Sequence, residues 1–141
     1  FHQAYALGEN LAATCLDLAW HHLSKDEIPT AEQAEEFEVE ALKKIGLYDP
    51  QVPPRYSTSY FNHVWGGGYA DGYYSYLWTD VLACNVVETF QKLGALKPET
   101  GDAFRKKILS RGNTKDQMEM FTDFTGMKTP DSSGFLKYRG L

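Results

Sequence analysis

Cysteine is scarce in this sequence, and long hydrophobic runs are missing. The 141 residues contain two cysteines, Cys15 and Cys84, which form no CxxC pair and fall in apolar patterns typical of helices. We interpret them as buried free thiols of a protein in the reducing cytoplasm, with a single disulfide as the open alternative. Since no run of about 18 apolar residues and no basic leader before an apolar stretch occurs, we predict neither a membrane span nor a signal peptide.

Positive charge is also in short supply. Lysine and arginine number 14 against 19 aspartates and glutamates, which gives a formal net charge of -5. Sequence-independent binding to nucleic acid needs clustered cations that neutralise phosphates, so we expect no nucleic-acid partner. With 43% apolar and 23% charged residues, the composition is that of one ordinary globular domain.

Common catalytic and phosphate-binding motifs are absent. No HExxH, GxSxG, GxxxxGK[ST] or GxGxxG occurs, and no two of the four histidines lie three or four positions apart. Asp17 and His21 are four positions apart, but a hydrogen bond at a surface or interface explains this pair better than a metal site does. We therefore expect the chain to bind no metal alone and to supply no nucleophile.

Hydrophobic spacing predicts an all-α fold, because no segment shows convincing strand alternation. We expect helices over residues 5–23, 30–45, 70–93, 98–108, 114–125 and 132–138, with an extended connection at 48–56. Capping boxes at Thr30–Gln33 and Thr114–Gln117 open two helices, and Gly46, Gly94 and Gly126 end helices. The acidic residues of the second helix form a solvated face. The inward-facing residues expected on the later helices are Ala34, Phe37, Ala41, Ile45, Leu77, Val81, Cys84, Val87, Phe90, Met118, Phe121 and Phe124.

The stretch from His63 to Trp78 is dense in hydrogen-bond donors, with one histidine, four tyrosines and four glycines. If a helix begins near Ala70, Tyr73 and Tyr76 follow Tyr69 at offsets of four and seven, so the three phenols share one face. A phenol with a pKa of about 10 stays protonated at neutral pH and can donate to negative charge that develops on a reacting oxygen. Packing of these rings in a core is the alternative interpretation.

Three consecutive glycines, Gly66 to Gly68, precede Tyr69. They lose backbone entropy on folding and bury no side chain. We interpret them as a place where the backbone approaches a ligand closely or as a mobile hinge.

The segment from Phe61 to Trp78, FNHVWGGGYADGYYSYLW, resembles the C-terminal part of the thimet oligopeptidase and peptidyl-dipeptidase family of zinc metallopeptidases. Its three glycines are more similar to the bacterial peptidyl-dipeptidase branch than to the thimet branch, which usually shows two. Supporting matches extend over nearly the whole chain, at residues 5–7, 11–13, 37–42, 53–56, 108–113 and 138–141.

The resemblance implies a larger, mostly helical metallopeptidase catalytic domain, of which residues 1–141 would be a single C-terminal segment. The HExxH helix and the glutamate that completes the zinc site would lie upstream of Phe1. Zinc would therefore be a cofactor of the full-length parent, and this chain alone would be inactive. The substrates would be short peptides that lose C-terminal dipeptides, with plain oligopeptidase activity left open.

The resemblance also implies roles for individual residues. Tyr69 and Tyr76 would donate hydrogen bonds to the oxyanion of the reaction, and His63 would contact the substrate or intermediate. The glycine-rich loop would move as the cleft closes. The substrate-binding residues would be Tyr73, Gly67 and Gly68.

A free-standing helical interaction module, which keeps these residues for packing, is the competing hypothesis. For the peptidase, we expect a monomeric parent. The isolated chain would expose apolar faces that are covered in the parent, above all on the first helix, and would self-associate through them.

Overall fold

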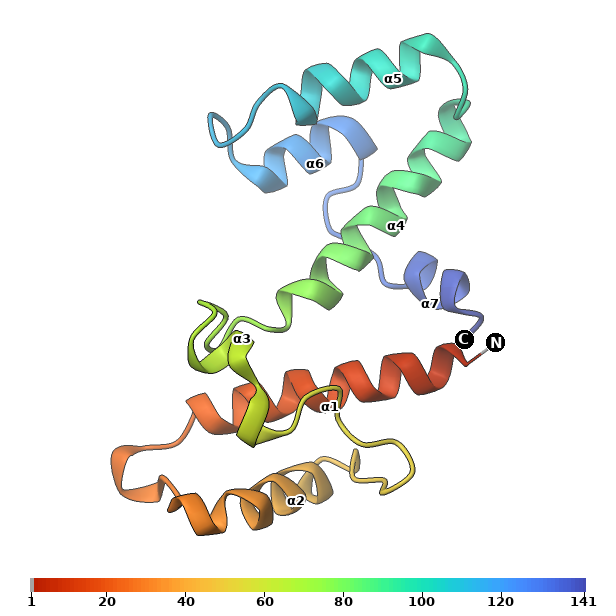
Figure 1. Ribbon diagram of the computed structural model, residues 1–141. Helices are drawn as coiled ribbons and strands as arrows, with labels where there is room; N and C mark the ends of the chain where they lie inside the picture. Colours follow the sequence, from red (N-terminus) through yellow and green to blue (C-terminus); the bar gives the residue numbers. More distant parts are fainter. Residues whose placement is uncertain (1) are drawn as a thin grey trace. The chain divides into compact units, whose positions relative to one another are not determined.

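Every regular element in residues 2–141, the range that the computed structural model describes, is helical (Figure 1). The predicted all-α fold is confirmed. Within this range, no helix combines the length and the apolar character needed to cross a membrane. The α-helices are α1 (Gln3–His21), α2 (Ala34–Lys44), α3 (Asn62–Trp65), α4 (Ser75–Leu93), α5 (Pro98–Phe104), α6 (Gln117–Thr125) and α7 (Ser133–Arg139). The shorter elements are the 3₁₀ turns η1 (Lys25–Glu27), η2 (Ala31–Gln33) and η3 (Thr58–Tyr60) and the π-helical turn η4 (Arg105–Leu109).

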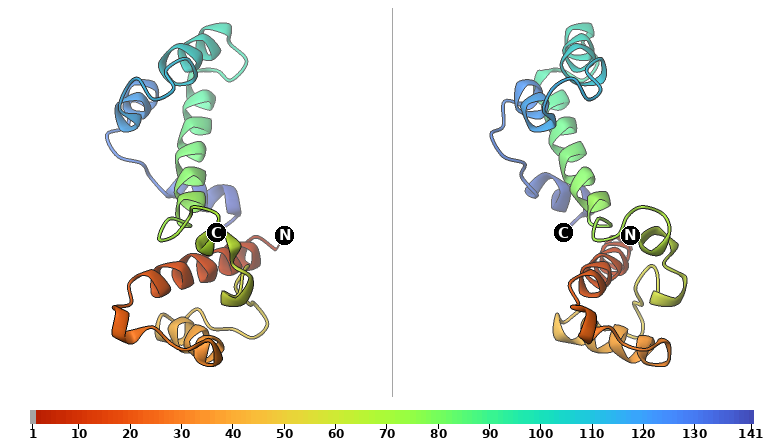
Figure 2. Two further views of the ribbon diagram at one scale, coloured as in Figure 1. Left: turned by 60° about the vertical axis from the view of Figure 1, so that its left-hand side comes forward. Right: turned by 90° about the vertical axis from the view of Figure 1, so that its left-hand side faces the viewer.

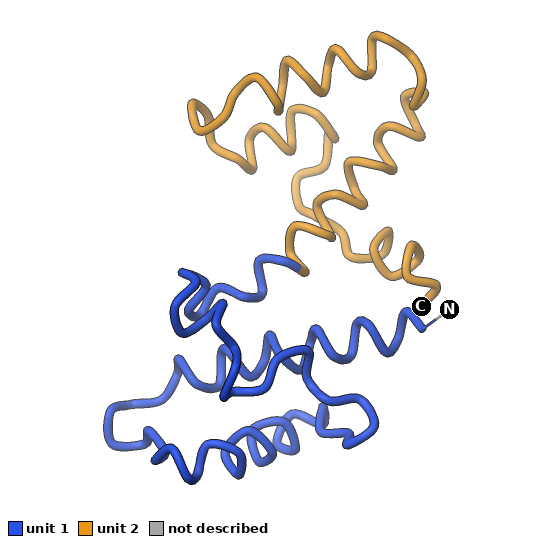
Figure 3. The backbone as a smooth tube through the Cα atoms, in the orientation of Figure 1, with its two compact units in different colours: residues 1–76 blue, residues 77–141 orange. Residues whose placement is uncertain are grey.

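The chain divides into two compact units, residues 1–76 (unit 1) and residues 77–141 (unit 2) (Figure 3). The boundary falls inside α4, so Ser75 and Tyr76 belong to unit 1 and the rest of the helix belongs to unit 2.

In unit 1, α1 and α2 lie side by side and run in opposite directions (Figures 1 and 2). The ring of Trp20 on α1 packs against Phe37 on α2 with centroids 4.3 Å apart, and its indole donates to the hydroxyl of Thr58. α1 ends at His21, two residues before the predicted Leu23. Ala13, Phe61, Val64 and Tyr73, each 0 to 4% exposed, pack together as a buried apolar cluster.

The predicted start and stop signals of the second helix are confirmed. The side chain of Gln33 accepts a hydrogen bond from the Thr30 amide at 3.1 Å, and η2 leads directly into α2. Gly46 adopts a left-handed φ of 72°. Its amide donates to Lys43 O and the amide of Leu47 donates to Leu42 O, so a Schellman motif closes the helix.

Two predictions about the faces of α2 are wrong. Ile45 is 48% exposed because it occupies the C-cap, where the chain leaves the helix, and Leu42 is buried in its place. Glu38 does not lie on a solvated face, since it is only 9% exposed. Its carboxylate accepts hydrogen bonds from the Ser57 hydroxyl and the Thr58 amide, each at 2.8 Å. Glu38 thereby fastens the connection that leads to α3.

The start of the fourth helix also differs from the prediction. α4 begins at Ser75 rather than near Ala70, and residues 70–74 form a turn. Asp71 has a φ of 57°, which is outside the helical region, and the amides of Asp71 and Tyr73 donate to the side chain of Asp17. A helix here would need other backbone angles and would compete for these amides.

In unit 2, three aromatic rings pack together. Phe90 of α4, Phe104 of α5 and Phe124 of α6 lie with centroids 5.2 to 5.4 Å apart. Asn85 is fully buried on α4; its amide donates to Asp131 O at 2.8 Å and its oxygen accepts from Asp131 N at 3.0 Å. This pair of bonds fastens the segment before α7 to α4. Val87, predicted to face inward, is 53% exposed.

The remaining helix boundaries of unit 2 follow the predictions with local differences. Gly94 and Gly126, both with positive φ, end α4 and α6 as expected. α6 is capped by Asp116, whose side chain accepts from the Glu119 amide, and not by Thr114. Met118, predicted to face inward, is 37% exposed in the first turn, whereas Met120 is buried together with Phe121 and Phe124. The run at 98–108 is α-helical to Phe104 and then widens into η4.

Cys15 and Cys84 are free thiols, as predicted, but both are half-buried and not fully buried.

Candidate active site

Four of the residues singled out from the sequence come together in unit 1. We call His63, Tyr69, Tyr73 and Tyr76 the tyrosine cluster. Tyr76 is central, because its ring centroid lies 5.3 Å from Tyr69, 5.0 Å from Tyr73 and 6.2 Å from His63. The imidazole of His63 lies 5.8 Å from Tyr69 and 5.5 Å from Tyr73. The rings therefore converge although the helix expected to align them starts later.

The members of the cluster differ in exposure. Tyr69 is 37% exposed and Tyr76 is 41% exposed, whereas Tyr73 is 4% exposed and belongs to the core. Tyr73 packs edge-on against Phe61 with centroids 4.8 Å apart. Tyr69 and Tyr76 can thus reach a ligand from solvent, while Tyr73 forms the floor beneath them.

The electrostatics favour protonated phenols. A side-chain hydrogen bond between Tyr69 and Tyr76, with further contributions from partial burial and neighbouring tyrosines, raises the pKa of Tyr76 to about 12. Burial, and to a smaller degree Tyr56, raises the pKa of Tyr73. Both groups therefore remain hydrogen-bond donors at neutral pH, which suits stabilisation of an anionic oxygen and does not suit a general base.

The glycines before Tyr69 have a backbone role. A Cβ atom on Gly67 would lie 2.9 Å from both Cα and O of His63, so only glycine fits there without displacement. Gly68 has a φ of 81°, and the Tyr69 amide then donates back to His63 O at 3.0 Å. The chain folds onto its own preceding helical turn, α3, and this brings Tyr69 over His63. Contact of Gly67 and Gly68 with a substrate stays a prediction.

Two neighbours of the cluster, Tyr56 and Asp17, were not predicted from the sequence. Tyr56 stacks on Phe61 at 5.1 Å and lies 4.9 Å from His63, and no periodic pattern pointed to it. Asp17 is 0% exposed, and its carboxylate accepts from the amides of Asp71 at 3.0 Å and Tyr73 at 2.9 Å. His21 Nδ1 lies 2.8 Å from the same carboxylate. The Asp17–His21 spacing was the available signal, but it does not reveal what lies opposite.

A metal site cannot be assembled from the described residues. Among residues 2–141, no group of three or more histidine, cysteine, aspartate or glutamate side chains is placed to hold an ion. The tyrosine cluster itself offers phenols and one imidazole, which is a donor set for an anion and not for a zinc ion.

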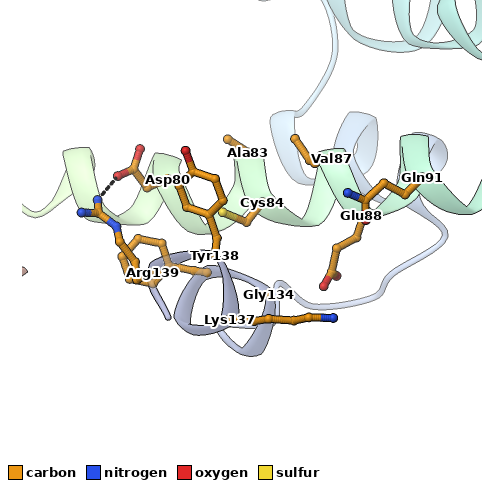
Figure 4. Close-up of a pocket in the computed structure, with 11 residues that line it drawn as sticks. Asp80, Ala83, Cys84, Val87, Glu88, Gln91, Gly134, Lys137, Tyr138 and Arg139 are labelled. Atoms are coloured by element: carbon orange, nitrogen blue, oxygen red, sulfur yellow. Dashed lines mark hydrogen bonds and ion pairs between the residues drawn. The ribbon is translucent and has the colours of Figure 1, made fainter. Parts of the chain in front are cut away.

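Unit 2 has a separate groove of about 470 Å³ between α4 and α7 (Figure 4). Asp80 and Arg139 form an ion pair of 3.1 Å at one end. Cys84 lies on its wall, and burial, with a smaller effect of Asp80, raises the pKa of the thiol, so the thiol is a poor nucleophile. None of the site residues predicted from the sequence lines this groove.

The described part of this helical chain gathers phenol donors around an imidazole, and donors of this kind are able to stabilise developing negative charge. The chain belongs to peptidase family M3, whose family model matches residues 1–141. The resemblance identified from the sequence is thereby confirmed.

Several proteins similar to this chain are peptidases by name. The chain is 42% identical over 141 residues to the dipeptidyl carboxypeptidase of Escherichia coli (strain K12), which covers all of this chain and 20% of that protein. Its identity to the dipeptidyl carboxypeptidase of Salmonella typhimurium is 44% over 142 residues, with the same two shares. Oligopeptidase A of Escherichia coli is 43% identical over 81 residues, 57% of this chain and 12% of that protein. The chain thus spans about a fifth of the length of the dipeptidyl carboxypeptidases that it matches.

Proposed function

We propose that residues 1–141 are the C-terminal segment of the catalytic domain of a cytoplasmic zinc metallopeptidase that acts on short peptides and releases their C-terminal dipeptides. In this proposal the segment supplies hydrogen-bond donors to the transition state. The observation that carries the proposal is the convergence of Tyr69 and Tyr76 beside His63 in a chain of peptidase family M3.

The proposed chemistry follows from the phenols. When a nucleophile adds to a peptide carbonyl, negative charge develops on the carbonyl oxygen. The phenols of Tyr69 and Tyr76 are half-exposed and can donate to that oxygen, because a phenol group is a hydrogen-bond donor at neutral pH. His63 lies at the same edge, where it would contact the substrate or the intermediate. Tyr73, Gly67 and Gly68 would form the adjoining wall.

Zinc does not fit the residues of this chain, because no ligand set is present in residues 2–141. In the proposal its ligands belong to the remainder of a longer polypeptide, which is consistent with the share of the relatives that the chain matches. Bound zinc supplies polarisation of the carbonyl and activation of water. The chain alone would then lack activity.

Release of dipeptides is the finer part of the proposal. Its support is that the two dipeptidyl carboxypeptidases align with the entire chain, whereas oligopeptidase A aligns with 57% of it. Incubation of the full-length protein with a short peptide and with its C-terminal amide, followed by mass spectrometry, tests this. We expect dipeptides from the free acid and little turnover of the amide; internal cleavage of both would indicate an oligopeptidase.

The roles of the phenols are tested by Tyr69→Phe and Tyr76→Phe in the full-length protein. Each change removes one donor and keeps the ring. We expect kcat to fall by about 10²–10³, equivalent to ~2.7–4 kcal/mol, because the interaction forms only in the transition state. Steady-state kinetics with a zinc-loaded preparation gives the measurement.

Tyr74→Phe is the matched control, since it deletes the same atom from a half-exposed tyrosine of the same turn that lies outside the tyrosine cluster. Its kcat should stay that of the wild type. If the Tyr69 and Tyr76 variants also turn over at the wild-type rate while folded, the donor role is wrong.

A further inference from the structure

A buried carboxylate of α1 holds the turn between Tyr69 and Tyr76. Asp17 Oδ1 accepts from the Asp71 amide and Oδ2 accepts from the Tyr73 amide, so both oxygens are used by the turn. His21 completes the arrangement, because its Nδ1 lies 2.8 Å from both Asp17 Oδ1 and Asp17 O. Since both partners of Nδ1 are acceptors, we assign the proton to that nitrogen.

The conformation of this turn depends on contacts from outside the turn. Asp71 adopts a φ of 57°, a left-handed conformation that is unfavourable for a residue with a Cβ atom. Such a conformation persists only where the surroundings enforce it. Other backbone bonds of the turn are local, from Gly72 N to Tyr69 O, from Ser75 N to Gly72 O and from Tyr76 N to Tyr73 O. The bonds to Asp17 come from 54 and 56 positions away and tie the turn to another helix.

The hydrogen bonds to Asp17 also restrict the positions of the aromatic rings of the tyrosine cluster. Fixing the Tyr73 amide fixes the origin of a side chain that is 4% exposed and lies 5.0 Å from the Tyr76 ring and 5.5 Å from His63. Tyr69 precedes the turn and stacks on Tyr76. A shift of the turn would therefore move the floor and both exposed phenols together.

We propose that Asp17 is the positioning residue of the tyrosine cluster, which sets where the phenols of Tyr69 and Tyr76 point without touching the substrate. Its effect on catalysis rests on the proposed function, whereas its effect on the turn does not. The two parts can therefore be tested separately.

The catalytic part is tested by Asp17→Asn in the full-length protein. Asparagine keeps the shape of the aspartate side chain but has only one acceptor oxygen. Its NH₂ group would therefore face one of the two backbone amides, of Asp71 or Tyr73, that need an acceptor. We expect kcat to fall about 10- to 100-fold with KM nearly unchanged, as for misplaced catalytic groups.

Glu38→Gln is the matched control. Glu38 is also a buried carboxylate of unit 1 that accepts from a backbone amide, but it holds the connection at Ser57 and Thr58. We expect both variants to lower Tm and only Asp17→Asn to lower kcat. Equal losses of kcat in both, or a wild-type kcat in Asp17→Asn, would overturn the positioning role.

The structural part is tested on the 141-residue chain by amide hydrogen exchange of the wild type, which needs no activity, and by NMR of the Asp17→Asn variant. We expect the Asp71 and Tyr73 amides to exchange as slowly as those of the buried part of α1, and the Tyr73 and Tyr76 ring resonances to shift in Asp17→Asn. Rapid exchange of these two amides in the folded wild-type chain would overturn the proposal even if the peptidase assignment stands. Conversely, slow exchange together with an inactive full-length wild type would count against the proposed function and leave the hold of Asp17 intact.

Discussion

At the scale of single residues, the hydrogen bond between Tyr69 and Tyr76 affects the protonation of Tyr76. This bond stabilises the protonated phenol of Tyr76, and this is the largest reason why the pKa of Tyr76 rises to about 12. The pair is thereby suited to donate to a negatively charged oxygen. It would also resist loss of activity through phenol ionisation in mildly alkaline solution.

The raised pKa has a measurable consequence. A tyrosine of the unfolded chain titrates at about 10, so the bond to the protonated Tyr76 stabilises the fold below that pH. Its contribution is lost as the pH rises through about 12. We expect NMR of ¹³Cζ-labelled tyrosine, assigned with Tyr76→Phe, to show Tyr76 titrating above the unfolded value.

Tyr69→Phe removes the first cause of this shift and should move the pKa of Tyr76 toward about 10. Tyr74→Phe should leave it in place. A titration of Tyr76 that does not respond to Tyr69→Phe would mean that the hydrogen bond is not the cause.

At the scale of elements, the passage from α3 to α4 depends on one close backbone contact. The chain passes so near α3 at Gly67 that a methyl group would meet His63 Cα and O at 2.9 Å. We predict that Gly67→Ala lowers the free energy of unfolding by about 1–3 kcal/mol, the usual range for an inserted group that must displace its surroundings. Urea denaturation followed by circular dichroism measures the change.

Gly101→Ala is a control that should change the free energy of unfolding in the opposite direction. Gly101 lies within α5, and nothing within 4 Å would meet its Cβ atom. Alanine there should raise the free energy of unfolding by about 0.5–1 kcal/mol, because glycine loses more backbone entropy in a helix. A Gly67→Ala variant as stable as the wild type would show that the turn adapts without strain.

Several element boundaries that depend on neighbouring residues could be predicted from the sequence, whereas the Asp116 cap of α6 was missed although its partner Glu119 is three positions away. The Thr30–Gln33 start and the Gly46, Gly94 and Gly126 stops are short-range signals, and they hold in the structure. The start of α4 could not be predicted, because it is set by Asp17, 54 positions from Asp71. Burial of Glu38 was missed for the same reason, since its partners come from another segment.

The candidate site, too, could be predicted from the sequence only in part. The convergence of the phenols was expected from a helix that would begin near Ala70, yet it arises from a turn, the Gly67 contact and the core position of Tyr73. The residue types alone predicted hydrogen-bond donation by phenols. The arrangement of these side chains could not be predicted, because it depends on contacts between elements.

At the scale of the whole molecule, large apolar side chains remain at the surface. Leu96 is 99% exposed, Leu109 is 64% exposed, and Trp65 and Trp78 are 49% and 45% exposed. Single exposed apolar residues are ordinary on a protein surface. Several large ones on a chain that spans about a fifth of the length of its relatives suggest surfaces that other parts of a longer protein would cover.

We therefore predict that the isolated chain self-associates. Light scattering at two concentrations should give an average mass that exceeds the monomer mass and rises with concentration. Replacing Trp65 and Trp78 by serine should lower the apparent mass at the higher concentration. A constant monomer mass in both samples would show that these side chains do not drive association.

Tyr73 serves both the interior of unit 1 and the ring arrangement beside His63. In a randomised library screened first for folded protein and then for peptide turnover, position 73 should lose most of its diversity at the first screen, whereas positions 69 and 76 should lose theirs at the second. For the proposed peptidase, we therefore expect natural or directed variation of substrate specificity to spare Tyr73.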